Sequence, residues 1–168
     1  MGEHFQDERL TAVGLLYEAF AGLNSRFAAQ FCAHGLSTVE FEVLTRLARS
    51  PGHQLRMTDL AAQTSLSTSG VTRVVDRMER DGLIGRRACP ADRRSSYAVI
   101  TQAGLSRLDE ILPGHLELIE QWFTGQLEPA QLSAFLDALR TIRDAVHPCA
   151  TAGSTASGHA PEHAVVEA

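Results

Sequence analysis

Apolar residues recur at three- and four-residue steps through the first part of the chain, and this pattern predicts a long amphipathic helix over residues 8–32. Other apolar side chains, such as Leu15 and Tyr17, widen the apolar surface of this helix beyond one stripe. The stripe itself consists of Leu10, Val13, Leu16, Phe20, Leu23, Phe27 and Phe31. A helix with so wide an apolar surface needs more than one packing partner, and a second subunit is a natural candidate.

Capping residues divide the following stretch into three shorter helices. Residues 37–40 (Ser-Thr-Val-Glu) form a capping box that starts a second helix, and residues 50–52 (Ser-Pro-Gly) should end it. Thr58 is expected to cap a short third helix, and Ser67 a fourth. Residues 81–82 (Asp-Gly) should end the fourth helix, because glycine accepts the left-handed conformation that commonly follows a helix.

The hydrophobic period then changes from about four residues to two. Tyr97 and Val99 alternate with Ala98 and Ile100, which is typical of a strand. A shorter apolar segment begins at residue 83, and the loop between the two segments is rich in arginine. The pattern therefore predicts a small β-hairpin between the fourth helix and the rest of the chain.

Two further helices follow the hairpin. Thr101 caps a long helix over residues 101–125, and Pro113 should kink it because proline removes a backbone N–H and clashes with the preceding turn. Pro129 stands at the first position of a sixth helix over residues 129–147. Both helices carry apolar residues at helical spacing.

The predicted elements form one domain over residues 8–147, mainly α with a small β-hairpin. Residues 37–100 have the element order of a winged helix-turn-helix: two short helices, a tight turn and a hairpin. Long helices flank this unit on both sides. The last residues, 148–168, are small or polar with little to bury, so we expect a disordered tail there.

The charge distribution separates the winged unit from the rest of the chain. All 15 basic residues are arginine, and the chain as a whole has a net charge of −5. Residues 65–100 hold seven arginines against four acidic residues, a local charge of +3, which leaves −8 for the remainder. A basic island in an acidic protein is expected of a small surface that faces phosphates.

Several other classes of protein are disfavoured by the same residues. No apolar run approaches the roughly 20 residues that span a bilayer, and the polar start does not resemble a secretory signal, so we expect a cytoplasmic protein without membrane contact. Cys32, Cys89 and Cys149 lack metal-site or disulfide spacing. We find no nucleophile elbow, phosphate loop or zinc-protease motif. The sequence therefore predicts no enzyme, no cofactor and no metal.

The fourth helix has the two faces that a DNA-recognition helix needs. Val71, Val75 and Met78 can pack on the domain, and the other face can enter the major groove. That face carries short hydroxyl side chains followed by arginines: Ser67, Thr68, Ser69, Thr72, Arg73 and Arg77. Gly70 costs about 1 kcal/mol in a helix relative to alanine. Either a close approach to the DNA backbone or a crowded helix crossing can explain it.

The hairpin loop is a second candidate for DNA contact. Arg93 and Arg94 are suited to a minor groove, where negative potential concentrates. Asp92 either braces one of these arginines or simply forms the turn, and we expect the bracing role.

The chain resembles the multiple antibiotic resistance regulator (MarR) family of bacteria over about residues 8–147. The resemblance rests on four segments, with a wing Asp-Arg-Arg at its usual distance from Thr-Arg-x-Val-Asp-Arg: residues 66–78, 81–84, 92–94 and 100–104. It implies a homodimer held together by the first, fifth and sixth helices, over residues 8–32, 101–125 and 129–147. Such dimers bind pseudo-palindromic operators, with the recognition helices in successive major grooves and the wing arginines in flanking minor grooves. Members usually act as repressors.

The resemblance also implies a signal that releases the DNA. In many members a small anionic or phenolic ligand binds between the dimerisation and reading regions, along the first, second and fifth helices. The residues of this chain that fit such a site are Tyr17, Phe20, Phe41, Leu44 and Arg49. The alternative is a thiol-oxidation sensor of the same fold, for which Cys32 is the candidate. A winged helix that binds only proteins would lack an arginine-tipped wing, which this chain has.

Overall fold

The computed structural model describes residues 3–89 and 92–153, and for residues 3–4 and 92–94 the backbone alone. Within these residues, six α-helices and three strands follow one another in the order α1, α2, β1, α3, α4, β2, β3, α5, α6. Their bounds are Glu8–Ala33, Thr38–Ala48, Gln54–Arg56, Met57–Gln63, Thr68–Arg80, Ile84–Cys89, Asp92–Ile100, Gln102–Trp122 and Pro129–Val146. The predicted class, mainly α with a small hairpin, is confirmed.

Three of the predicted capping residues begin helices as expected. The Ser37 hydroxyl accepts a hydrogen bond from the Glu40 N–H at 3.3 Å, and the Glu40 carboxylate accepts one from the Ser37 N–H at 2.7 Å. Ser67 caps α4 and Thr101 caps α5, each accepting an N–H from the residue three positions later at 3.1 Å. The N-terminal ends of these three helices are therefore determined by local sequence.

The start of α3 differs from the prediction. The helix begins at Met57, and Thr58 lies inside its first turn, so the predicted cap at Thr58 is wrong. The reason is strand β1, which the sequence pattern did not reveal: it ends at Arg56, and Arg56 then serves as the N-cap residue without a side-chain capping bond. A strand of three residues is too short to show an alternating pattern, and it forms because β3 offers hydrogen-bonding groups along its free edge.

The sheet and three helices share one hydrophobic core. The strands are antiparallel in the order β1-β3-β2, so the hairpin of β2 and β3 gains β1 as a third strand. We call α2, α3, α4 and this sheet the reading head. Its core includes Leu44, Leu60, Val75, Met78 and Ala98, all fully buried. This burial is the main favourable term that holds the reading head together.

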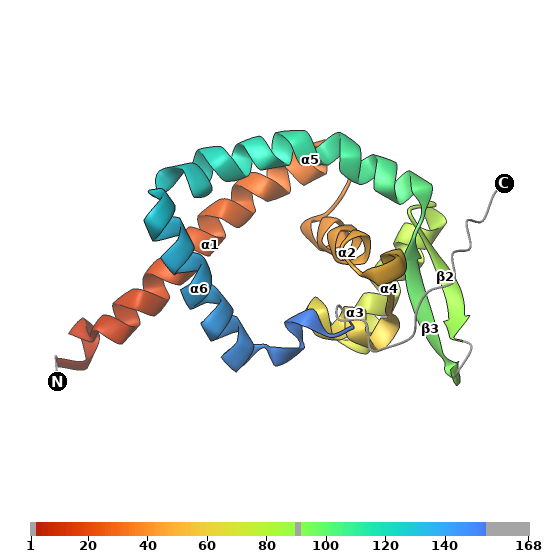
Figure 1. The fold of residues 1–168 in the computed structure, drawn as a ribbon, viewed down its shortest axis with the longest axis horizontal. Helices are drawn as coiled ribbons and strands as arrows, with labels where there is room; N and C mark the ends of the chain where they lie inside the picture. The colour runs from red at the N-terminus through yellow and green to blue at the C-terminus, as the bar shows by residue number, and fades with distance from the viewer. Residues whose placement is uncertain (1–2, 90–91, 154–168) are drawn as a thin grey trace.

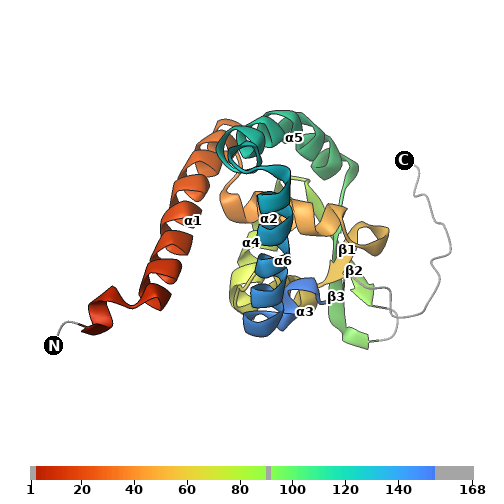
Figure 2. The ribbon, with the colours of Figure 1, turned by 60° about the vertical axis from the view of Figure 1, so that its left-hand side comes forward.

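The long helices lie outside the reading head. Figure 1 shows α5 (green) running away from the β2–β3 hairpin, which we call the wing, and lying beside α1 (red). Helix α6 (blue) turns back toward α3, and Figure 2 shows the same return of α6 from another side. Pro113 lies within α5, which curves along its length but does not end there. At the start of α5, a Cβ on Gly104 would stand 2.3 Å from the Leu83 carbonyl oxygen, so only glycine allows α5 to pack this closely on the backbone just before β2.

The C-terminal segment differs from the expected disordered tail. Residues Pro148–Thr151 form a 3₁₀ turn (η4) in which Ala150 is buried. Arg46 of α2 donates a hydrogen bond to the Ala150 carbonyl at 3.0 Å, Gln63 of α3 donates to the Ala152 carbonyl, and His147 contacts the Ala62 carbonyl at 2.7 Å. The prediction of disorder is therefore wrong for residues 148–153. Side chains of α2 and α3 donate hydrogen bonds to the backbone carbonyl groups of this segment, and these bonds order it without large apolar side chains. Residues 154–168 lie outside the described part.

Candidate nucleic-acid interface

Helix α4 has the two faces that its sequence predicts. Val71, Val75 and Met78 are fully buried against the rest of the reading head. On the opposite face, the hydroxyl residues at the helix N-terminus and Arg73 are exposed, and Thr72 is half-buried: Ser67, Thr68, Ser69, Thr72 and Arg73. The structure thus brings five of the predicted recognition residues together on one polar surface.

The hydroxyl groups on this surface are partly engaged within the helix. Ser67 Oγ caps the helix and lies 3.2 Å from Ser69 Oγ. Thr72 Oγ1 donates to the Thr68 carbonyl oxygen at 2.8 Å. Hydroxyl groups can accept a second hydrogen bond while they donate one, so these side chains keep capacity for an outside partner.

Gly70 is explained by crowding in the turn before α4. A Cβ at this position would stand 3.1 Å from Ser67 Oγ and 3.6 Å from Leu66 Cβ. A methyl group would therefore press on the hydroxyl that caps the helix. Neither the DNA backbone nor a helix crossing is needed to account for this glycine.

Arg73 and Arg77, four residues apart on α4, have different surroundings. Arg73 is exposed and forms no ion pair with the side chains that the structure describes. Arg77 donates from Nε to Glu40 Oε1 at 2.6 Å, and its side chain is 48% exposed against 9% for Glu40. Arg77 therefore ties α4 to the capping box of α2, a role that the sequence did not predict.

Glu40 is ionised in spite of its burial. Burial alone would raise the pKa of this carboxyl, but hydrogen bonds from the Ser37 hydroxyl and N–H and the pairing with Arg77 outweigh it and hold the pKa below its ordinary value. A buried carboxylate with three donors is a fixed anchor. It sets how α4 lies relative to α2.

A second ion-pair cluster joins the wing to α4. Arg86 of β2 reaches Asp76 at 2.6 Å and Glu79 at 3.5 Å. Asp76 and Glu79 lie three residues apart, so both face the same side of α4. This spacing of two acids is the signal by which the sequence could have revealed the contact, and the partner arginine lies on the neighbouring strand.

The tip of the wing lies largely outside the described residues. Strand β3 begins at Asp92, and the register shifts between Ala88 and Cys89 where the hairpin narrows toward its loop. The side chains of Asp92, Arg93 and Arg94 are not described, so the bracing role of Asp92 and the minor-groove role of both arginines stay predictions.

A cavity of about 670 Å³ lies between the long helices and the reading head. Of the five predicted ligand residues, Phe20, Phe41 and Arg49 line it. The other two do not: Leu44 is fully buried in the core of the reading head, and Tyr17 is 69% exposed on α1. Helical spacing alone does not show which face of α1 or α2 meets the cavity, and the ligand role of all five residues stays a prediction.

The cavity combines aromatic walls with positive charge. Its aromatic side chains include Phe27, Phe31 and Phe41, and the ring centre of each lies less than 5 Å from that of His115. Burial lowers the pKa of His115, which favours the neutral ring. The arginines of the lining come from α2, its C-terminal end and α6: Arg46, Arg49 and Arg143. Thr45 Oγ1 is buried at the wall without a hydrogen-bond partner among the described residues.

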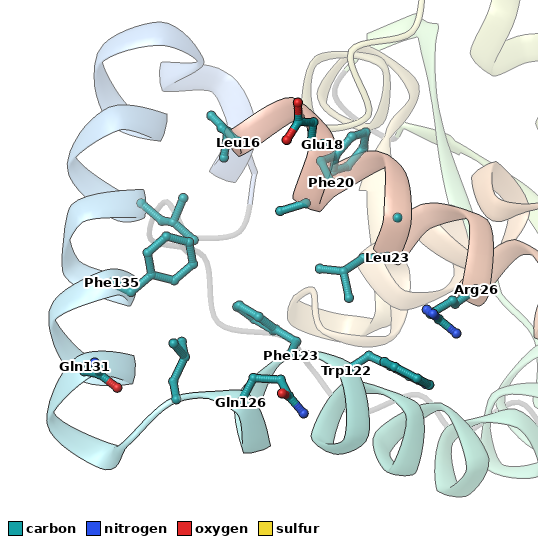
Figure 3. A pocket seen from close by; sticks show the side chains of 14 residues that line it. Leu16, Glu18, Phe20, Leu23, Arg26, Trp122, Phe123, Gln126, Gln131 and Phe135 are labelled. Atoms are coloured by element: carbon teal, nitrogen blue, oxygen red, sulfur yellow. The ribbon is translucent and has the colours of Figure 1, made fainter. Parts of the chain in front are cut away.

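A second hollow, of about 740 Å³, is almost wholly apolar and lies between α1, the end of α5 and α6. Figure 3 shows Leu23, Phe123 and Phe135 pointing toward it from these three helices. Next to it, Arg26 lies over the ring of Trp122, with 3.5 Å from Cζ to the ring centre. Such a surface of large apolar side chains is unusual on a lone subunit.

Membrane spans and metal sites were sought among the described residues as well. No described helix is both long enough and apolar enough to cross a membrane. Among the described residues, no group of three or more His, Cys, Asp or Glu side chains is placed to hold a metal ion.

Comparison with known proteins places the chain in one family. A family model described as MarR family matches residues 34–95. The regulator MhqR of Bacillus subtilis is 32% identical over 107 residues, which cover 64% of this chain and 72% of MhqR. The repressor YetL of the same species is 31% identical over 104 residues, and the match spans 62% of YetL, less than two thirds of its length.

Solved structures agree with these sequence matches. Sco3205 of Streptomyces coelicolor, a MarR family regulator in complex with DNA, has a TM-score of 0.78 at 29% identity, over 84% of this chain and 89% of that one. BpsR of Bordetella bronchiseptica, whose DNA binding is regulated by 6-hydroxynicotinic acid, has a TM-score of 0.69 at 25% identity, over 80% and 99%. The chain therefore belongs to the MarR family of transcriptional regulators, with α3, α4 and the β2–β3 hairpin as its winged helix-turn-helix.

Proposed function

We propose that the protein is a homodimeric repressor that binds a pseudo-palindromic operator and is released from it by a small aromatic anion. The observation that carries this proposal is the polar face of α4. Arg73 is exposed there without an ion pair to the described residues, next to a row of exposed hydroxyl groups. An arginine in this position can bind the O6 and N7 atoms of a guanine in the major groove.

The wing extends this contact. Arg93 and Arg94 enter the minor groove beside the segment that α4 reads, and Asp92 holds one of them in place. The Arg86 cluster supports this arrangement, because it attaches β2 to α4 and so keeps the hairpin at a constant angle to the recognition helix. Direct readout by α4 and shape readout by the wing then act on neighbouring grooves.

The dimer forms through the apolar surfaces of the long helices. Tyr17 and Phe20 of α1 are 69% and 66% exposed, and Leu116, Phe135 and Ile142 of α5 and α6 are also exposed. A second copy fills the apolar hollow shown in Figure 3 and covers these side chains. Two reading heads related by a two-fold axis then match two operator half-sites about 34–36 Å apart.

The effector binds in the cavity between the long helices and the reading head. Its aromatic walls suit a planar ring, and Arg46, Arg49 and Arg143 suit a carboxylate. BpsR, whose DNA binding is regulated by 6-hydroxynicotinic acid, indicates this class of ligand. Because the cavity touches both parts of the molecule, an occupant changes the spacing of the two reading heads and releases the DNA.

One binding experiment tests this proposal. Fragments of the source genome that the protein retains are selected and sequenced, and affinity for the strongest fragment is compared between wild type and Arg73→Ala. The variant should lose about 1–3 kcal/mol of operator affinity per half-site and keep its melting temperature. Equal operator affinity in both proteins would refute recognition through α4. Release of the wild type by millimolar 6-hydroxynicotinic acid, and not of an Arg49→Gln variant, would support the effector site.

A thiol-sensing repressor remains the second candidate because Cys32 is exposed at the end of α1. In that case dilute hydrogen peroxide releases operator DNA from the wild type and not from Cys32→Ser. The same assay without peroxide serves as the control, since Cys32 is remote from α4 and its replacement should leave operator affinity unchanged.

A further inference from the structure

The outer face of the three-stranded sheet carries a tyrosine between two arginines. Arg56 of β1 and Arg87 of β2 are both register partners of Tyr97 of β3. Their guanidinium carbons lie 5.9 Å and 5.7 Å from the centre of the Tyr97 ring, within the range of cation–π attraction. Leu55 and Ala98, which face the other side of the sheet, are buried in the core. We call Arg56, Tyr97 and Arg87 the wing row.

The side-chain hydrogen bonds of the two arginines of the wing row go to neutral groups. Arg56 donates from Nε to the Tyr97 hydroxyl at 3.3 Å, and Arg87 donates from Nη2 to Gln54 Oε1 at 2.5 Å. Neither arginine is within ion-pair distance of a carboxylate among the described residues. Among the described residues of this acidic chain, seven other arginines do pair with a carboxylate: Arg9, Arg46, Arg77, Arg86, Arg107, Arg140 and Arg143.

Both arginines are also exposed, so the wing row presents two positive charges on an ordered surface. A guanidinium that already lies on a ring and donates one hydrogen bond keeps several N–H groups for another acceptor. Holding it in place beforehand reduces the side-chain entropy that binding costs. Its planar fork matches the oxygens of a phosphate. The wing row is therefore suited to bind anions.

The position of the wing row on the reading head suggests the source of the anions that it binds. Arg86 faces α4, and Arg87, the next residue of β2, faces the opposite side of the sheet, since successive side chains of a strand alternate. Arg56 is the N-cap residue of α3, the first helix of the helix-turn-helix. The wing row thus extends from the start of α3 across the hairpin, on the side of the reading head that faces away from α4.

We propose that Arg56 and Arg87 each bind a backbone phosphate of the DNA beyond the segment that α4 reads, with Tyr97 holding both guanidinium groups in place. This inference rests on the proposed DNA binding. It adds a function to that proposal, because phosphate contacts outside the recognised segment strengthen binding to any sequence and carry no base specificity. The wing then has two surfaces: its tip in the minor groove and its outer face on the flanking backbone.

Salt dependence tests this inference without knowledge of the operator. Affinity is measured for the selected operator and for a random duplex of about 30 base pairs, over salt concentrations of about 50–400 mM. The proteins are wild type, Arg56→Gln, Arg87→Gln and the double variant. Each single change should lower the slope of log K against log salt by about 0.9, and the double change by about 1.8. At about 0.15 M salt, each change should weaken binding to both duplexes about fivefold.

Controls separate a phosphate contact from a general effect of charge or of folding. Arg9→Gln removes the same charge from the far end of α1, where the side chain is 90% exposed, and should leave the slope unchanged. Arg56→Lys and Arg87→Lys keep a positive charge and should restore most of the slope. Circular dichroism melts check that all variants are folded.

Two results would overturn the inference. One is a double variant with the wild-type slope on both duplexes. The other is a loss of affinity for the operator alone, which would indicate base readout. If the wild type bound neither duplex in a salt-sensitive manner, the proposed function would fail as well, so the two failures are distinguishable.

Discussion

At the scale of single residues, Glu40 connects two helices of the reading head through one carboxylate. It accepts hydrogen bonds from the Ser37 N–H and hydroxyl at 2.7 Å each and from Arg77 Nε at 2.6 Å. These donors favour the ionised form and outweigh the burial that opposes it. Glu40 therefore both caps the start of α2 and determines where α4 lies, so replacing Glu40 should also disturb the recognition surface.

This anchor should make the stability of the protein depend on pH. Because the pKa of Glu40 is lowered in the folded protein, its contribution is complete above the ordinary value of 4.5 and is lost as the pH falls through the folded pKa. Glu40→Gln should cost about 1–3 kcal/mol near neutral pH. Urea unfolding at several pH values measures this, and the difference from wild type should shrink below pH 4.5.

A matched control lies on the same helix. Glu42 is partly exposed and pairs with Arg46 four residues later, so Glu42→Gln should change stability by less than about 0.5 kcal/mol. A pH-independent difference between wild type and Glu40→Gln would show that packing, not charge, is responsible.

The division of roles between Arg73 and Arg77 could not be predicted from the sequence. Both lie on the polar face of α4 because four residues separate them. Arg77 finds its partner, Glu40, 37 residues away in the chain, and no local pattern connects these two positions. What the sequence did predict is local: the buried side chains Val71, Val75 and Met78, and the cap at Ser67.

At the scale of elements, the Arg86 cluster makes the wing and α4 one unit. Asp76 and Glu79 present two carboxylates to one guanidinium, at 2.6 and 3.5 Å. The pairs are partly exposed, so they contribute little to global stability. Their value lies in orientation, because they fix the direction of the β2–β3 hairpin relative to the recognition helix.

Replacing Asp76 and Glu79 shows whether they act through orientation of the wing or through charge alone, because the two roles predict opposite changes in operator affinity. Asp76→Asn with Glu79→Gln removes two negative charges, which by charge alone should strengthen DNA binding. If the cluster orients the wing, operator affinity should instead fall about three- to tenfold. Fluorescence anisotropy with labelled operator measures the change.

Asp81→Asn is the control for this experiment. Asp81 is exposed at the C-terminal end of α4 and forms no ion pair among the described residues, so its replacement should strengthen binding slightly. A double variant that binds as tightly as the charge change predicts would contradict the orienting role of Arg86.

The elements that the sequence did not reveal depend on distant partners. Helices α2, α4 and α5 begin at local capping signals, which is why their starts could be predicted. Strand β1 exists because β3 offers it an edge, and the η4 turn is ordered because Arg46 and Gln63 bind its carbonyl groups. Neither segment has enough apolar residues to show a period of its own.

At the scale of the whole molecule, the long helices present apolar surface that the reading head does not cover. Phe20 adjoins both the apolar hollow and the cavity between the long helices and the reading head, so the proposed dimer contact and the proposed effector site share this residue of α1. The η4 turn forms part of the cavity wall and also contacts α3, so it connects α6 to the reading head. In the proposed dimer, a change at the subunit contact can therefore reach the reading head through a short path.

The dimer can be tested by placing a charge on this face. The wild type should sediment at twice its chain mass of 18.2 kDa, and Phe20→Asp should shift it toward the single chain, because a carboxylate in an apolar interface is costly to bury. Thr68→Asp adds the same charge on the reading head and should leave the mass unchanged while it weakens DNA binding. Phe20→Asp should lose the preference for two half-sites over one, since a lone reading head spans a single half-site. A wild type that sediments as one chain and still prefers paired half-sites would contradict the dimer. In that case the effector could not act by changing the spacing between two reading heads.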